Sequence, residues 1–237
     1  MTDHQSFQRF AALAAIISFP LAVVSLVISS VATDFNMEAS TNVAFWLSWL
    51  SIGADGARLL RWGLILDMLS YYLPLLPVAL FLWRWLRSRN PDWVLFYTSC
   101  GLGYILVGAI GAAILAAVHP PLISAYTQAS VEQRQVLEAA VYSASGNIVY
   151  GGMWGILEVL LAGIWFLGIG LLLRGERHLF SIFSVILGIS ALLGLLGVIL
   201  SIEAISLLGV IYGLLAPIWA LWLGIDLLRE PVQIAAA

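Results

Sequence analysis

The sequence predicts an all-α polytopic membrane protein with six transmembrane helices and two amphipathic helices in the outer loops. Composition is the first reason: of 237 residues, 62% are hydrophobic and only 10% are charged, and the mean hydropathy is +1.02. A soluble domain carries about 25% charged residues, because its surface must face water. Too few charges are present here to cover such a surface. Most of the surface is therefore expected to face lipid.

The second reason is the length of the apolar runs. A bilayer core about 30 Å thick requires about 20 apolar residues in a helix. Six segments meet this requirement, and they make residues 1–237 a single integral membrane domain. The predicted spans are residues 10–32, 62–82, 93–118, 148–173, 179–201 and 205–228. The last two share one apolar run that would extend roughly 75 Å as a single helix. The chain must therefore reverse near Ser201–Glu203–Ala204.

The third reason is the distribution of arginine, which also predicts the orientation. All ten basic residues are arginine. With the N-terminus inside, the cytoplasmic side holds Arg9, Arg84, Arg87, Arg89, Arg174, Arg177 and Arg229, and the outer side holds Arg58, Arg61 and Arg134. Cytoplasmic loops of membrane proteins carry such an excess of basic residues. The N- and C-termini are therefore both expected to be cytoplasmic.

The two amphipathic helices are predicted in the loops at about residues 33–61 and 119–147. In the first loop, apolar residues recur at helical spacing at Phe45, Trp46, Trp49, Leu50 and Ile52. This pattern is typical of a helix lying in the membrane interface with its aromatic face among the headgroups. Such helices could cover the outer ends of the spans, or they could be ordinary connectors.

In the second loop, His119-Pro120-Pro121 is expected to end the third span. Ser130-Val131-Glu132-Gln133 then matches a capping box, which predicts that a helix begins here. An apolar stripe follows it on one face, opposite the charged residues Glu132, Arg134 and Glu138.

The C-terminal third carries a family resemblance. The segment Pro217-Ile218-Trp219-Ala220-Leu221-Trp222-Leu223-Gly224-Ile225, together with the span at Gly152–Leu173, resembles bacterial multi-pass membrane protein families described only as domains of unknown function. The resemblance implies no activity and no functional residues. The expected location is the bacterial inner (cytoplasmic) membrane.

Glu158 is the leading candidate for a functional residue. It lies ten residues past Ile148, roughly 15 Å down the helix and hence near the midplane of the bilayer. Ionisable groups at this depth are costly and mark functional sites by default. No arginine is expected at that depth, so we expect a protonated acid that hydrogen-bonds to another span. It could bind a proton or a ligand, or it could fix the packing of two helices.

Asp67 and Tyr71 form a second candidate site, about 8 Å below the outer boundary if the span begins at Trp62. Pro74 follows on the same face and is expected to bend the helix and free backbone carbonyls. These groups could line a water-filled vestibule. Alternatively, Asp67 could pair with Arg58 or Arg61 at the interface.

Small residues at four-residue spacing identify candidate helix interfaces. They include Gly108 with Ala112 and Gly151 with Gly155. Such pairs allow close helix contact, either among the spans or with a partner.

No cofactor, metal site or nucleic-acid contact is predicted. His119 and His178 are expected at opposite membrane surfaces, so they cannot share one iron. Ligation of a pigment or haem by either histidine alone is not favoured, because histidines at the boundary usually face water. No nucleophile motif, phosphate loop or basic patch is present, so enzymatic activity is not expected.

Two functions remain open, and the lipid bilayer is a partner in both. The first is a structural or partner-binding subunit of a membrane assembly, in contact with other membrane proteins or with copies of itself. It fits the sparse polar residues and the small-residue pairs. The second is a small transporter, channel or proton-coupled permease that uses Glu158 and Asp67.

Overall fold

The computed structural model describes residues 3–32, 49–230 and 232, without the side chains of residues 3, 51 and 142–146, and every regular element among them is helical. In chain order the elements are α1 (Asp3–Ala32), the 3-10 helix η1 (Trp49–Ile52), α3 (Gly53–Asp67), the π-helix η2 (Met68–Tyr72), α4 (Leu75–Leu86), α5 (Pro91–Gln128), α6 (Val131–Val141), the π-helix η3 (Tyr142–Glu158), α7 (Val159–Leu173), α8 (His178–Ile199) and α9 (Glu203–Arg229). Six helical stretches in this part of the chain are long and apolar enough to cross a membrane. The predicted fold class is confirmed.

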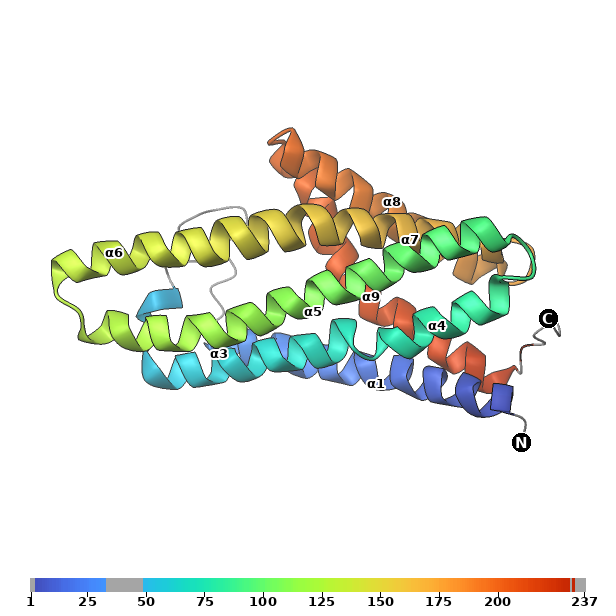
Figure 1. Cartoon of the computed structure of the whole chain (residues 1–237), viewed down its shortest axis with the longest axis horizontal. Coiled ribbons are helices and arrows are strands. Elements are labelled where there is room, and N and C mark those ends of the chain that lie inside the picture. The colour runs from blue at the N-terminus through green and yellow to red at the C-terminus, as the bar shows by residue number, and fades with distance from the viewer. Residues whose placement is uncertain (1–2, 33–48, 231, 233–237) are drawn as a thin grey trace.

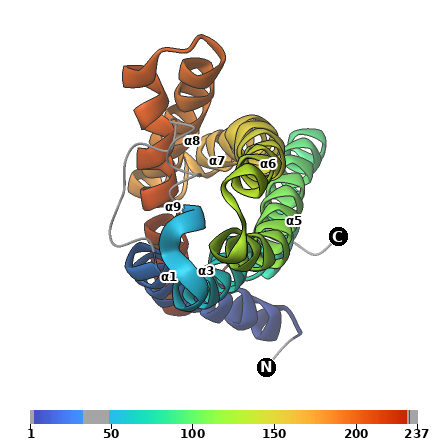
Figure 2. The same cartoon turned by 90° about the vertical axis from the view of Figure 1, so that its left-hand side faces the viewer.

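The helices form an elongated bundle (Figure 1). The start of α1 and the end of α9 lie together at one end, where the Gln8 side chain donates a hydrogen bond of 2.7 Å to the Leu227 carbonyl. The turn between α5 and α6 lies at the opposite end. Seen from that end, the hairpin of α8 and α9 leans away from α5 and α6 (Figure 2). The predicted reversal between the last two spans is confirmed, with Ser201 at a φ of 56°.

The predicted end of the third span was wrong, because α5 is longer than the membrane requires. α5 continues through Pro120 and Pro121 to Gln128 instead of ending at His119. A proline inside a helix removes one hydrogen bond and its ring crowds the carbonyl four residues back, but its fixed φ is helical, so the helix can resume beyond it. Packing of Ile123, which is 1% exposed, stabilises the added turns.

The second amphipathic helix begins where the capping box predicts. The Ser130 amide donates to the Gln133 side chain at 3.0 Å, and the Gln133 amide donates to the Ser130 hydroxyl at 3.4 Å. However, α6 runs into η3 and α7 without a break, so it extends the fourth span and is not a separate helix lying on the surface.

The first amphipathic helix is only partly within the described residues. Phe45 and Trp46 lie outside them. Trp49 and Leu50 are 7% and 1% exposed and pack with α3, α5 and η3. The expectation that they face the headgroups was wrong, because neighbouring helices bury them.

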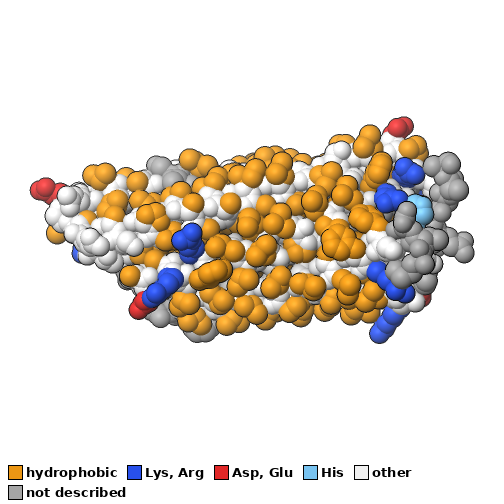
Figure 3. All heavy atoms as spheres, turned by 60° about the horizontal axis from the view of Figure 1, so that its bottom comes forward, with side chains coloured by type: hydrophobic (Ala, Val, Ile, Leu, Met, Phe, Trp, Pro, Cys, Tyr) orange, Lys and Arg blue, Asp and Glu red, His pale blue; other side chains and the backbone are white. Residues whose placement is uncertain are grey.

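The surface matches a membrane protein. Hydrophobic side chains cover the middle of the face in Figure 3, and charged side chains gather toward its two ends. At the end that holds α1 and α9, Arg177 pairs with Asp226 at 3.3 Å and with Glu230 at 3.0 Å. Arg89 pairs with Glu176 at the same end. These ion pairs tie α8 to α9 and the start of α5 to the end of α7.

Candidate functional site

Both intramembrane acids adjoin interruptions of their helices. Asp67 is the last residue of α3, directly before η2, and Glu158 is the last residue of η3. In the first interruption Pro74 has no N–H to donate, and the Leu73 amide bonds to the Met68 carbonyl at 3.1 Å, five residues back. Such π segments occur frequently at functional sites. The predicted disturbance of this helix by Pro74 is confirmed.

Glu158 is buried, with 7% of its surface exposed, and it bonds to another span as expected. The Tyr72 hydroxyl donates to Glu158 Oε2 at 3.1 Å, across 86 residues of sequence. Gly108 of α5 makes this contact possible, because a Cβ at that position would overlap the Tyr72 ring. The acid, the tyrosine and the glycine thus come from three different spans.

A second tyrosine joins this site to the interrupted backbone. The Tyr104 hydroxyl donates to the Tyr71 carbonyl at 3.1 Å. Its ring lies edge to face with Tyr72, with the centroids 5.6 Å apart. A carbonyl of the π segment is therefore satisfied by a side chain from α5, as the loosened backbone requires.

Asp67 lies on a cavity of about 190 Å³, which we call the Asp67 cavity. Its lining comes from α1, η1, α3, η2 and η3, and consists of Ser25, Leu26, Ser29, Trp49, Leu60, Leu64, Asp67, Tyr71, Tyr150 and Trp154. Asp67 Oδ2 is buried and has no hydrogen-bond partner. A buried acceptor without a partner is expensive, which makes it a candidate for binding something.

The interpretation that Asp67 pairs with Arg58 or Arg61 was wrong, because among the described residues neither arginine forms an ion pair with it. Arg58 pairs with Asp55, which lies one helical turn away on α3. Asp67 lies nine residues beyond Arg58, roughly 14 Å along the helix, which is too far for an ion pair. The structure places Asp67 and Tyr71 on one cavity.

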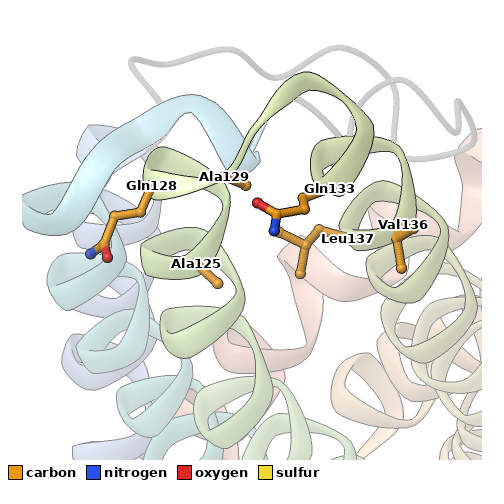
Figure 4. A pocket seen from close by; sticks show the side chains of 6 residues that line it. All are labelled: Ala125, Gln128, Ala129, Gln133, Val136 and Leu137. Carbon is orange, nitrogen blue, oxygen red and sulfur yellow. The ribbon is translucent and has the colours of Figure 1, made fainter.

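A larger hollow of about 520 Å³ lies between the end of α5 and the start of α6 (Figure 4). It is lined by Ala125, Gln128, Ala129, Gln133, Val136 and Leu137. None of these residues can ionise, so this hollow provides no acid or base. The Asp67 cavity and Glu158 are therefore the stronger candidate site.

The candidate interface residues divide into two groups. Gly108 and Ala112 are buried inside the bundle, where Gly108 faces Tyr72 and its carbonyl accepts a bond of 3.2 Å from the Trp154 indole. Gly151 is exposed and Gly155 is partly exposed. The first pair therefore serves internal packing, and the second pair adjoins the surface of the bundle.

The two histidines lie in different surroundings. His178 is exposed, as expected. His119 is 2% exposed, and its ring lies edge to face with Trp49 at 5.4 Å. The expectation that His119 faces water was wrong, because α5 continues past it and η1 covers it. No group of three or more metal-binding side chains occurs in the described part of the chain.

Sequence reasoning missed Tyr104 and Tyr150, which carry no sequence signal of their own because aromatic residues are frequent in every span. Trp154 lies on the helical face of Glu158 and Tyr72 adjoins Tyr71, but neither position identifies a hydrogen-bond partner. Tyr72 follows Asp67 by five residues, which is the spacing of a π-helix, and this spacing was the available signal.

The fold and the site define a multi-pass helical membrane protein with buried acids between its spans. The chain belongs to a family described as a domain of unknown function (DUF4386), whose profile matches residues 11–229. This confirms the resemblance to an uncharacterised multi-pass family and extends it over nearly the whole chain. No curated protein and no solved structure matches the chain.

Proposed function

We propose that the protein is a small proton-coupled permease in which Asp67 and Glu158 take up and release protons. One observation carries the proposal: Asp67 presents an unpartnered carboxylate oxygen on a cavity within the spans, and Ser25 and Ser29 line the same cavity. A packing role alone does not account for it, because a packing acid is satisfied by its neighbours. Acids inside a membrane commonly form proton relays.

The arrangement of the two acids supports a relay between them. Asp67 and Tyr72 belong to the same interrupted stretch of helix, and the Tyr72 hydroxyl bonds to Glu158. A hydroxyl both donates and accepts, so it can pass a proton from one oxygen to another. The cavity is large enough to hold several water molecules beside Asp67.

The π segments give a second line of support. Segments of this kind occur frequently at functional sites. Here two of the six spans contain π segments, and the acids stand at their ends.

The test is proton flux into liposomes that contain the purified protein, with a pH-sensitive dye inside and an imposed membrane potential. Wild type should acidify the interior above the protein-free background. Glu158→Gln and Asp67→Asn should each lower the flux at least tenfold, because neither side chain titrates. Asp92→Asn is the matched control, since Asp92 is exposed at the start of α5. Equal flux in wild type and Glu158→Gln would refute the proposal.

A second candidate function is a partner-binding subunit. The exposed apolar side chains on α6 support it, since Val131 is 74% and Val136 is 70% exposed. Val136 also lines the hollow of Figure 4. Its test is the mass of the protein extracted from its native membrane in mild detergent. Migration within a defined larger assembly would favour this function, and a monomer would refute it.

A further inference from the structure

Aromatic rings surround the unpartnered acid on several sides of the Asp67 cavity. Trp49, Tyr71, Tyr150 and Trp154 line the same space as Asp67. Trp49 and Tyr150 meet edge to face with centroids 6.2 Å apart, and Tyr150 and Trp154 do so at 4.9 Å. Because these rings also line the cavity, they bound an open space beside Asp67.

This lining is held in place from outside the cavity. The Trp154 indole donates to the Gly108 carbonyl at 3.2 Å, which fixes the plane of that ring. Gly111 of α5 leaves the space that this indole occupies, because a Cβ there would overlap it. Ser25, which also lines the cavity, donates a hydrogen bond of 2.8 Å to the Gly63 carbonyl and so joins α1 to α3. These hydrogen bonds hold Trp154 and Ser25 in place in the lining.

The chemistry of this lining selects one class of ligand. An aromatic box attracts cations through the negative faces of its rings, and organic ammonium ions with methyl groups fit it best because they are weakly hydrated. One carboxylate adds the balancing charge. Hard metal ions need several oxygen ligands, and residues 3–32, 49–230 and 232 contain no cluster of three metal-binding side chains.

We infer that the Asp67 cavity binds a small organic ammonium ion, held by the Asp67 carboxylate and the four aromatic rings. The cavity volume of about 190 Å³ suits a cation of choline size. This inference deepens the proposed function, on which it rests for the site, by naming the class of substrate. The ammonium ion would then take the place of the proton on Asp67, and Glu158 would hold the second proton.

The test is isothermal titration of the purified full-length protein in mild detergent with choline chloride. Wild type should bind choline saturably. Dimethylbutanol, the uncharged carbon analogue of choline, should bind about tenfold more weakly or worse, because it has the same shape without the charge. Asp67→Asn should weaken choline binding by about tenfold or more. Asp92→Asn, the same change at an exposed site, should leave it unchanged.

A second pair of variants tests the rings. Tyr150→Phe keeps the aromatic face and should bind choline within about threefold of wild type, whereas Tyr150→Leu should bind it about tenfold more weakly. If Tyr150→Leu does not elute as a single folded species, the Asp67→Asn comparison carries the test alone. Absent choline binding by wild type, or equal binding of choline and its uncharged analogue, would overturn the inference.

Binding in detergent involves no proton gradient, so the two proposals can fail separately. Proton flux without choline binding would refute only the ammonium site. Choline binding without any flux change in Glu158→Gln would refute only the proton-coupled permease.

Discussion

Replacing Gly108 with alanine should destabilise the bundle through a single contact. Gly108 is buried in α5, and an added Cβ would overlap the Tyr72 ring. That ring cannot move freely, because Tyr72 is only 5% exposed and packs edge to face against Tyr104. The ring must shift, and the 3.1 Å hydrogen bond to Glu158 must then lengthen or break.

The magnitude follows from three effects. Forcing an extra methyl into a packed core costs about 1–3 kcal/mol. Losing a hydrogen bond between spans costs about 0.6–1 kcal/mol. Alanine in a helix gains about 1 kcal/mol over glycine, which partly offsets the loss. The net expectation is a loss of about 2 kcal/mol.

Reversible unfolding in mixed micelles of mild detergent and SDS would measure this change. Gly213→Ala is the matched control, because no heavy atom lies within 4 Å of a Cβ added there. Its stability should equal or slightly exceed that of wild type. If Gly108→Ala were as stable as Gly213→Ala, the close packing of Tyr72 on α5 would be refuted.

Three further changes have defined outcomes. A double-mutant cycle of Tyr72→Phe with Glu158→Leu should give a coupling energy of about 1 kcal/mol, measured by the same unfolding assay. Arg177→Gln should cost about 1–2 kcal/mol, because its side chain is only 13% exposed and joins two carboxylates of α9. Ser130→Ala should cost about 1 kcal/mol and speed amide hydrogen exchange in the first turn of α6, because it removes the bond to the Gln133 amide.

One result would contradict each of these three predictions. Additive effects of the two substitutions in the cycle would show that Tyr72 and Glu158 do not interact. Arg58→Gln is the control for Arg177→Gln, since Arg58 is 73% exposed and its pair should contribute less than about 0.5 kcal/mol. Equal losses for the two arginines would contradict the structure. Unchanged exchange in Ser130→Ala would rule out the capping box.

The sequence was sufficient for features that depend on the length of a segment or on the chemistry of a single residue. The length of an apolar run fixes whether it can span a bilayer, so all six spans could be predicted. The reversal at Ser201 follows because 50 residues of helix would be too long for one crossing. The need of a buried acid for a partner predicted that Glu158 bonds to another span.

The sequence does not identify that partner, because the partner is set by how the helices pack in space. Tyr72 and Glu158 lie in the π-helices η2 and η3. A π-helix has more residues per turn than an α-helix, so its side chains point in other directions than α-helical spacing predicts. Helical spacing assumes 3.6 residues per turn and so misplaces these side chains. The burial of Trp49 and His119 likewise depends on the length of α5. Its end was predicted too early, because Pro120 and Pro121 were expected to end the helix.

The proposed proton transport depends most on water reaching the Asp67 cavity. Labelling of Ser25→Cys by a charged methanethiosulfonate reagent tests this directly, in a Cys100→Ala background that removes the single native thiol. Ser184→Cys is the matched control, because Ser184 is fully buried between α8 and α9 and lines no part of the cavity. We expect Ser25→Cys to react at least tenfold faster than Ser184→Cys. If both thiols fail to react with the reagent, the cavity is closed to ions and water, and the proposed proton transport is contradicted.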